Sequence, residues 1–213
     1  MTRPARVVVV AGTGTGVGKT WVAARLSGLL ADRGLRVAAR KPVQSYAPDE
    51  LGRTDAELLA AVTHVTPTTV CPVHRWYPVP FAPPMAAAAQ GKEPFVIDTL
   101  AAELVASWSA PPADIGVVEL AGGPRSPIAA DGDCVALIAT IRPDVVVLVA
   151  DAGLGTINAV TLSIDALTGW PLIVLLNRFD PHEELHRRNQ AWLADRLTCP
   201  VVTTLDALRD LVY

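Results

Sequence analysis

A glycine-rich stretch that follows a short apolar run near the N-terminus restricts the fold of this chain more than any other feature. The run Val7 to Ala11 leads directly into Gly-Thr-Gly-Thr-Gly-Val-Gly-Lys-Thr, residues 12–20. A buried strand that breaks into glycines and begins a helix at Gly-Lys-Thr forms a phosphate-binding loop, because the glycines let backbone N–H groups converge on phosphate oxygens. A strict loop has its first glycine at position 13, where this chain has Thr13, so the spacing from Gly12 is one residue longer. We expect a nucleoside triphosphate as ligand; the alternative is a glycine-rich turn with an exposed lysine.

Length and composition favour one domain, residues 1–213, with 51% hydrophobic residues to bury. The net charge is −3 and no basic block occurs, so we expect no nucleic-acid partner. The N-terminal apolar run is too short for a signal peptide or a membrane span, which predicts a cytoplasmic protein without membrane contact. Cys71, Cys134 and Cys199 lack the spacing of a zinc site or disulfide framework, so we expect reduced thiols.

Short apolar runs alternate with helical patterns along the chain. Several runs are continuous rather than alternating, as strands covered on both faces require. This order predicts an α/β fold of the P-loop nucleoside triphosphatase type: a doubly wound, mostly parallel sheet with helices on both faces and ligands at the carboxyl ends of the strands. The expected strands are 7–11, 35–39, 115–120, 145–150, 172–176 and 201–203, and the expected helices are 19–33, 54–62, 98–108, 134–141, 157–167 and 183–197. The proline-rich segment 67–94 has no periodicity, and we expect a functional loop or an element that the pattern does not reveal.

Two charged residues stand where strands of this fold would end, and a third lies at the start of an expected helix. Lys41 follows the strand at 35–39, where it would neutralise a phosphoryl group or hold an anionic substrate; a solvated lysine is the alternative. Glu119 ends another apolar run, the position at which such folds present a carboxylate to Mg²⁺. Asp55 is a second metal candidate, but Thr54 and Glu57 have capping-box spacing, so an acid in the first turn of a helix explains it equally well.

Five motifs together resemble the dethiobiotin synthetase family. The family's loop commonly has the same longer spacing, and residues 12–20 match it throughout. Lys41-Pro42-Val43 with Ser45 is similar to its substrate-lysine motif, and Thr54-Asp55-Ala56 to its metal aspartate. The remaining matches are Glu119-Leu120-Ala121-Gly122-Gly123 and Leu154-Gly155-Thr156-Ile157-Asn158.

The resemblance implies a cyclo-ligase that makes dethiobiotin from 7,8-diaminononanoate, CO₂ (or bicarbonate) and ATP, with Mg²⁺. One amine captures CO₂ as a carbamate, the carbamate takes the γ-phosphoryl group, and the second amine closes the ureido ring with loss of phosphate. The implied catalytic residues are Lys41, Lys19 and Thr15. The implied substrate ligands are Ser45 and, across a homodimer, Gly155, Thr156, Ile157 and Asn158. The implied nucleotide ligands are Gly16, Val17, Gly18, Lys19, Thr20, Trp21, Asp55, Glu119, Gly122 and Asn177, of which Thr20, Asp55 and Glu119 would hold the metal.

Four positions depart from the family pattern. Leu120 replaces a glycine and would put a side chain where the backbone approaches phosphate. Tyr46 stands where glycine is common, Ala159 where histidine is usual, and Arg125 adds a charge after the glycine pair. The segment 202–205 also lacks the proline that usually closes over the base.

Two other functions remain open at this point. Asn177-Arg178-Phe179-Asp180 approximates the guanine-reading Asn-Lys-x-Asp of GTPases, which would make the chain a nucleotide-operated switch. A non-catalytic paralogue that binds nucleotide is the second. The four histidines have no partners at metal-site spacing, except that His182 and His186 share one helix face, and we expect no metal there. We expect four tryptophan rings to pack rather than stack on a base: Trp21, Trp108, Trp170 and Trp192.

Overall fold

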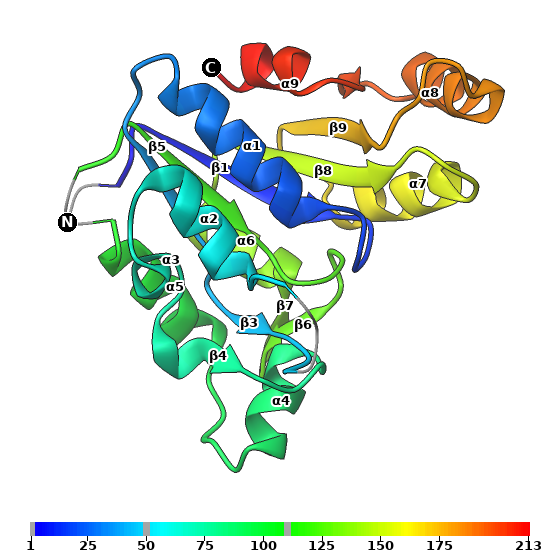
Figure 1. The fold of residues 1–213 in the computed structure, drawn as a ribbon. Helices are drawn as coiled ribbons and strands as arrows, with labels where there is room; N and C mark the ends of the chain where they lie inside the picture. The colour runs from blue at the N-terminus through cyan, green and yellow to red at the C-terminus, as the bar shows by residue number, and fades with distance from the viewer. Residues whose placement is uncertain (1–2, 49–51, 109–111) are drawn as a thin grey trace.

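Six parallel strands form the central sheet of the computed structural model, which describes residues 3–48, 52–108 and 112–213. Their order across the sheet is β10-β9-β8-β1-β5-β2, so the strand before the glycine-rich loop lies in the interior (Figure 1). All neighbouring pairs are parallel, which places their carboxyl ends at one edge. The strands are β1 (Arg6–Gly12), β2 (Val37–Arg40), β5 (Ile115–Glu119), β8 (Val145–Asp151), β9 (Leu172–Asn177) and β10 (Val201–Val202).

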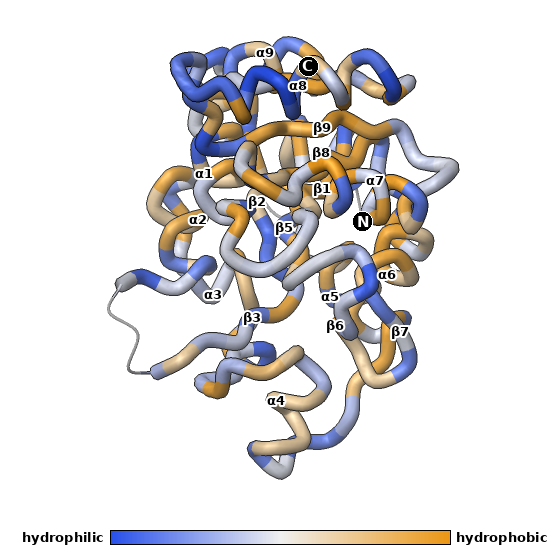
Figure 2. The backbone as a smooth tube through the Cα atoms, turned by 90° about the vertical axis from the view of Figure 1, so that its right-hand side faces the viewer, coloured by the Kyte–Doolittle hydropathy of each residue, from blue (hydrophilic) through white to orange (hydrophobic). Residues whose placement is uncertain are grey.

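Helices cover both faces of this sheet, which confirms the predicted doubly wound α/β fold. One apolar core packs against α1 (Lys19–Ala31), α2 (Asp55–Thr63) and α9 (Leu205–Val212). The opposite core packs against α5 (Ile97–Ala106), α6 (Cys134–Ile141), α7 (Thr156–Ala166) and α8 (Glu184–Arg196). Figure 2 shows the hydrophobic strands in the middle and the hydrophilic surface of the C-terminal helices outside.

The alternation of side chains along β1 explains why its sequence is apolar throughout. Val7 and Val9 belong to one core and Val8 and Val10 to the other, and all four are fully buried. Successive side chains of a strand point to opposite faces, so a strand with a core on each side needs no polar positions. Side chains also alternate between the two faces of the sheet at the end of β5, where Glu119 lies.

The segment 67–94 contains short elements that the sequence pattern did not predict. They are α3 (Pro67–Val70), the 3₁₀ turn η1 (Val73–Arg75), β4 (Trp76–Tyr77) and α4 (Pro83–Ala89). β4 pairs in parallel with β3 (Gln44–Ser45), which ties this region to the end of β2 (Figure 1). Near it lies the hairpin of β6 (Pro127–Ala129) and β7 (Gly132–Asp133). Arg75 fixes the segment by stacking 4.1 Å from the Phe95 ring centroid and by pairing with Glu103 at 2.7 Å.

The predicted helices and strands occur in the expected order, with ends that differ by one to a few residues. The helix expected over 157–167 begins one residue earlier at Thr156, and the strand expected over 35–39 begins at Val37. Helix α9 was not predicted; Thr204 caps it by accepting a hydrogen bond from the N–H of Ala207. In the described ranges no helix has both the length and the apolar character that a membrane crossing requires.

Candidate nucleotide and substrate site

The glycine-rich loop is held in its shape by three side chains that bind its carbonyl groups. Lys19 Nζ donates to the carbonyl of Gly14 at 2.8 Å, Arg178 to Gly16 at 2.8 Å, and Asn177 Nδ2 to Val17 at 2.9 Å. In a trans peptide the N–H and the C=O point in opposite directions. Side chains that bind the loop carbonyls from one side therefore leave the N–H groups of the same peptides pointing to the opposite side of the loop. The loop is therefore built to present donors to an anion.

Gly18 is the position in the loop where a side chain is least compatible with this arrangement. Its φ is 94°, a left-handed conformation that favours glycine, and it precedes the first residue of α1. A Cβ built there would overlap Nδ2 of Asn177. Glycine at this position thus lets β9 approach the loop closely enough for Asn177 to bind it.

Four side chains from four elements meet beside the loop. Thr20 Oγ1 lies 2.7 Å from Asp55 Oδ1 and 2.8 Å from Glu119 Oε1. Lys41 Nζ lies 2.6 Å from Asp55 Oδ2 and 2.7 Å from Glu119 Oε1. These side chains come from the first turn of α1, the start of α2, and the residues at the ends of β2 and β5. The parallel sheet brings them together because its carboxyl ends share one edge.

The charges in this cluster are strongly coupled because they are buried. Burial opposes the charged form of Lys41, but Glu119 and Asp55 outweigh it and hold the Lys41 pKa above its usual value. Burial likewise disfavours the Asp55 carboxylate, yet Lys41 keeps the pKa of Asp55 below normal. Burial raises the pKa of Glu119, which is only 1% exposed, with nearby Asp55 acting in the same direction and Lys41 against it. Burial and nearby Lys41 lower the pKa of Lys19.

The oxygens of the cluster fit a hard cation. Glu119 Oε2 is buried and has no hydrogen-bond partner among the described residues. Thr20 has one hydroxyl proton, so it can donate to only one of the two carboxylates that it touches. Mg²⁺ is bound by one or two carboxylates together with phosphate oxygens and water, so a third acidic ligand is not needed. In the described part of the chain no group of three or more His, Cys, Asp and Glu side chains forms a metal cluster.

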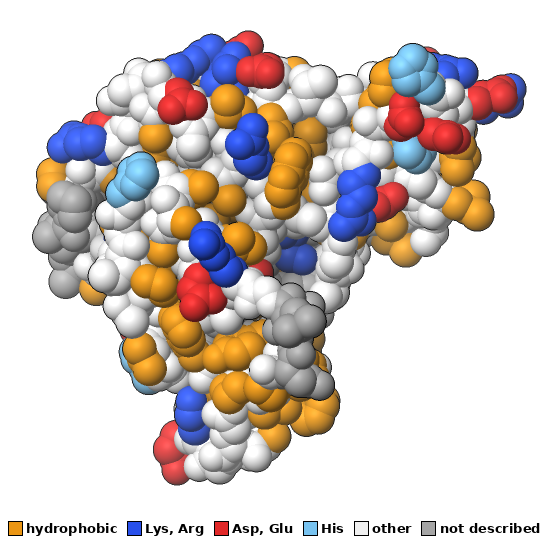
Figure 3. All heavy atoms as spheres, in the orientation of Figure 1, with side chains coloured by type: hydrophobic (Ala, Val, Ile, Leu, Met, Phe, Trp, Pro, Cys, Tyr) orange, Lys and Arg blue, Asp and Glu red, His pale blue; other side chains and the backbone are white. Residues whose placement is uncertain are grey.

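A pocket of about 390 Å³ opens over this cluster and collects most of the predicted site residues. Figure 3 shows the surface hollowed on the side where the strands end, below the α7 and α8 region. Of the predicted residues it is lined by Thr15, Gly16, Gly18, Lys19, Thr20, Lys41, Ser45, Asp55, Glu119 and Gly122. Gln44 and Arg53 also line it and were not predicted. The position of Gln44 within the Lys41–Ser45 motif is the only feature of the sequence that could have predicted its place in the pocket. Its Nε2 is buried and has no partner among the described residues.

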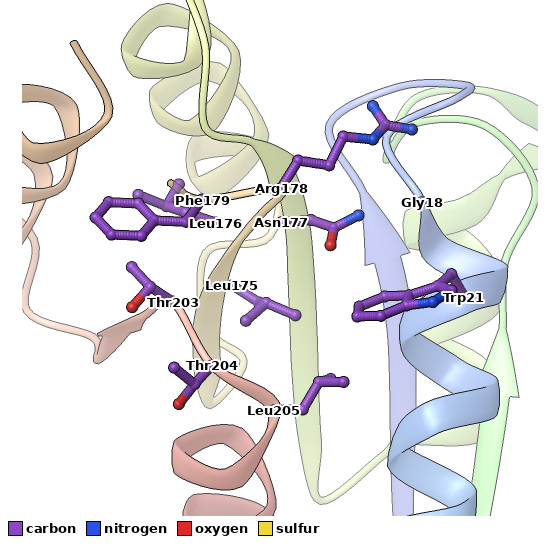
Figure 4. Close-up of a pocket in the computed structure, with 10 residues that line it drawn as sticks. All are labelled: Gly18, Trp21, Leu175, Leu176, Asn177, Arg178, Phe179, Thr203, Thr204 and Leu205. Carbon is purple, nitrogen blue, oxygen red and sulfur yellow. The ribbon is translucent and has the colours of Figure 1, made fainter. Parts of the chain in front are cut away.

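A second cavity, of about 570 Å³, lies on the other side of the loop (Figure 4). Trp21 and Asn177 line it, together with Phe179, Thr203 and Leu205. The expectation that Trp21 is a packing residue is wrong: Trp21 is 52% exposed, because α1 turns this position away from the sheet and toward the residues after β9.

Asp180, the last residue of the GTPase-like motif, does not line this cavity; its Oδ1 accepts a hydrogen bond from the N–H of His182. Among the described residues no acidic side chain lines this cavity, so a guanine base there would lack the carboxylate that the GTPase motif requires.

The segment Gly155 to Asn158 lies apart from these residues, at the start of α7. None of its four residues lines the pocket over Lys41. Gly155 caps the helix with φ 90°, and the hydroxyl of Thr156 is buried without a partner among the described residues. On the adjoining surface Leu154 is 90% and Leu162 is 62% exposed.

The departures from the family pattern have separate outcomes. The expectation that the Leu120 side chain approaches the phosphate position is wrong, because it is 1% exposed and belongs to the core. Glu119 points to the site, and its neighbour along the chain must point to the opposite face. Tyr46 lines the pocket over Lys41, and Ala159 lines a groove beside the loop. Arg125 is exposed and pairs with Asp133 at 3.0 Å.

Comparisons with known proteins agree with this geometry. A family model described as an AAA domain matches residues 6–212. The chain is 39% identical to the ATP-dependent dethiobiotin synthetase BioD of Frankia casuarinae over 75% of this chain and 65% of that protein. It is 36% identical to the protein of the same name from Haloferax mediterranei, over 95% of this chain and 85% of the other. The match thus spans slightly less than two thirds of the first relative and most of the second.

Solved structures with the same fold include two FtsY proteins. Chloroplast FtsY from Physcomitrella patens superposes with a TM-score of 0.60, covering 100% of this chain and 66% of that one at 16% identity. Signal recognition particle receptor FtsY from Elizabethkingia anophelis superposes with a TM-score of 0.57. This match covers 94% of this chain and 59% of that one, also at 16% identity. At this level of identity the likeness concerns the fold alone.

Proposed function

We propose an activity for this chain from the premise that it belongs to the dethiobiotin synthetase family. Its function is that of an ATP-dependent dethiobiotin synthetase, a ligase that forms carbon–nitrogen bonds. The substrates are 7,8-diaminononanoate, CO₂ and ATP, and the product is the ureido ring of dethiobiotin. The single observation that carries the proposal is the convergence of the loop, two lysines and two carboxylates in one pocket.

The chemistry assigns a role to each group in that pocket. One substrate amine adds to CO₂ and loses a proton, a carbamate oxygen takes the γ-phosphoryl group as its bond to ADP breaks, and the second amine attacks the carbonyl carbon while phosphate leaves. Lys19 and Lys41 both line the pocket, and their positive charges would stabilise the negative charge that gathers on the carbamate and phosphoryl oxygens. Thr15 and Ser45 line the same pocket and would hydrogen-bond the amine end.

We assign Mg²⁺ to Thr20, Asp55 and Glu119. When bound, the ion would neutralise phosphate charge during transfer. The support is the Glu119 Oε2, unpartnered among the described residues, and the Thr20 hydroxyl, which lies within hydrogen-bonding distance of one oxygen of Asp55 and one oxygen of Glu119. Lys41 pairs with both carboxylates, and a bound cation would take over part of this charge compensation.

We assign the nucleobase to the cavity beside Trp21 and Asn177. Gly18 lines both cavities, so a nucleotide whose phosphates meet the loop can extend its base there. Asn177 Nδ2 is committed to the Val17 carbonyl, which leaves its Oδ1 as an acceptor for a base amino group. The half-exposed Trp21 ring offers a stacking surface.

We also propose that the site is completed by a second copy of the chain. The resemblance assigns the substrate carboxylate to the backbone N–H groups of residues 155–158, which do not line the pocket of their own chain. A helix start attracts a carboxylate. The exposed Leu154 and Leu162 beside it would be covered by such a partner.

Phosphate release from ATP, measured with and without diaminononanoate and bicarbonate, tests the proposed reaction. We expect release only when both are present, and dethiobiotin in equal amount. Lys41→Gln should abolish product while sparing ATP binding, whereas Lys92→Gln, an exposed lysine outside the pocket, should behave as the parent. ATP binding without any turnover would instead identify a non-catalytic paralogue, and substrate-independent GTP hydrolysis would identify a switch.

Mixing two inactive variants tests the composite site. Lys41→Gln damages one half, and Gly155→Pro removes a backbone donor from the other. Mixed dimers carry one site with both halves intact, so partial activity should return. Mixed dimers that form and remain inactive would exclude the shared site.

A further inference from the structure

A cavity of about 290 Å³ lies beside the end of β2 and is lined by Arg40, Lys41 and Pro42 among others. It is separate from the pocket described above, since Lys41 is the one residue common to both linings. Its walls are mostly apolar and come from α3, α5 and the residues after β2. They include Pro42, Val70, Pro72, Leu100 and Leu104. Its volume is at the lower end of the range for small-molecule sites.

Arg40 is a buried charged residue in the lining of this cavity. Its side chain lines the cavity and only 4% of the residue is exposed. The guanidinium donates to Ser107 Oγ at 2.9 Å, to the Ser107 carbonyl at 2.7 Å and to the Ala39 carbonyl at 2.8 Å. These three acceptors are neutral, and a guanidinium has five N–H groups, so two donors remain.

Buried charges in proteins are paired, and Arg40 departs from that rule. Among the described residues no carboxylate forms an ion pair with it; Glu103, which also lines the cavity, pairs with Arg75 and His74 instead. Leaving a buried ion without a counter-ion carries a substantial desolvation penalty. Burial lowers the pKa of Arg40 to about 10, so the group is still a cation at neutral pH.

We propose that this cavity is a binding site for a small amphipathic monocarboxylate. The carboxylate takes the two remaining Arg40 donors, and the aliphatic tail lies against Leu100, Leu104 and Val70. A carboxylate and a guanidinium make strong, geometrically matched hydrogen bonds, and one negative charge matches that of Arg40, for which the described residues provide no ion pair. The apolar walls favour an alkyl chain over a phosphate or a dicarboxylate.

The position of the cavity connects it to the end of β2. The N–H of Lys41 donates to the carbonyl of Val70 at 2.9 Å, so one wall of the cavity is bonded directly to the main chain of Lys41. A ligand that packs on Val70 therefore contacts the segment that presents the Lys41 ammonium to Asp55 and Glu119.

Calorimetric titration with octanoate and octanamide at neutral pH tests the proposal without any turnover. The two probes share a chain and differ in charge, so octanoate should bind about tenfold or more tightly. Arg40→Met should remove that preference. Because Arg40→Met could fail to fold, a second variant blocks the cavity and keeps the arginine: Ala106→Trp, at an exposed lining position near the end of α5. Ala102→Trp is its control, exposed on the same helix and outside the lining.

Loss of octanoate binding in Ala106→Trp, with binding retained in Ala102→Trp, is the expected result. Equal binding of the two probes, no octanoate binding by the parent chain, or binding that survives Ala106→Trp would each overturn the proposal. The last outcome would mean that octanoate binds at another site, and the first two would leave Arg40 as a cap for the C-terminus of α5 only.

Discussion

Replacing Lys41 by methionine removes the cation on which two buried carboxylates depend. Lys41 is 3% exposed, and its Nζ lies 2.6 Å from Asp55 and 2.7 Å from Glu119. Methionine keeps the length and the apolar stem of the side chain and deletes only the charge. The variant therefore holds two neighbouring carboxylates, one of them 1% exposed, without a cation between them.

The loss of folding free energy has an upper limit, because the variant can always relieve the repulsion by protonating Glu119. A glutamate in the unfolded chain has a pKa near 4.3, so holding a proton at pH 7 costs at most about 3.7 kcal/mol, at about 1.36 kcal/mol per pH unit. This agrees with the roughly 3–5 kcal/mol seen when one partner of a buried ion pair is removed. For a chain of this length the loss lowers Tm by about 10 °C.

The sign of the pH dependence distinguishes this mechanism from simple loss of packing. In the parent chain the Asp55 pKa lies below normal, so its stabilisation is present above the unfolded pKa and is lost as the pH falls. In the variant the Glu119 pKa should rise further above its unfolded value, so the part of the deficit that Glu119 causes grows as the pH rises and shrinks as the pH falls toward the unfolded pKa. The part that Asp55 causes is lost only at still lower pH. The two stability curves should converge on acidification.

Urea unfolding at pH 4.5, 6 and 7.5, with chelator present, measures this difference. Lys92→Met is the control, since Lys92 is an exposed lysine away from the carboxylates. A Lys41→Met protein that matches the parent at every pH, or whose deficit is the same at pH 4.5 and 7.5, would refute the charge argument.

Three further outcomes follow from the loop and the cysteines. Lys19→Ala should weaken ATP binding at least tenfold in calorimetry while the protein stays folded, because it removes the loop's own cation; unchanged affinity would contradict the loop assignment. Gly18→Ala should cost about 1–3 kcal/mol in thermal unfolding through its positive φ, and more where Asn177 cannot move aside. A thiol reagent at pH 8 should label half-buried Cys199 first, and Cys71 only on unfolding, because burial raises the Cys71 pKa to about 12.

The parts of the site that the sequence predicted are those set by local geometry. The strand, the glycines and the Gly-Lys-Thr helix start are contiguous, and the parallel sheet then brings Lys41 and Glu119 to the same edge. Asp55 had two explanations. It lies in the first turn of a capped helix, as one of them predicted, and its contact with Thr20 leaves its role as a metal ligand a proposal.

Other features depend on packing that no local pattern encodes. The direction of the Trp21 ring depends on the gap between α1 and the residues after β9, which belongs to the folded chain. The elements of segment 67–94 have two to seven residues, too few to show a helical or strand period. The burial of Leu120, by contrast, follows from strand alternation. Glu119 faces the site, so the side chain of the next residue, Leu120, faces the core.

The ties from Asn177 and Arg178 to the loop carbonyls also have a kinetic consequence. Asn177 is the last residue of β9 and Arg178 follows it, so a strand of the central sheet holds the phosphate-binding loop in place before any ligand binds. Little conformational entropy is then lost on association, and the association rate constant should be similar for nucleotides that share a triphosphate. Nucleotides with different bases should differ in their dissociation rate constants, because the base contacts the cavity beside Trp21 and Asn177 and not the loop.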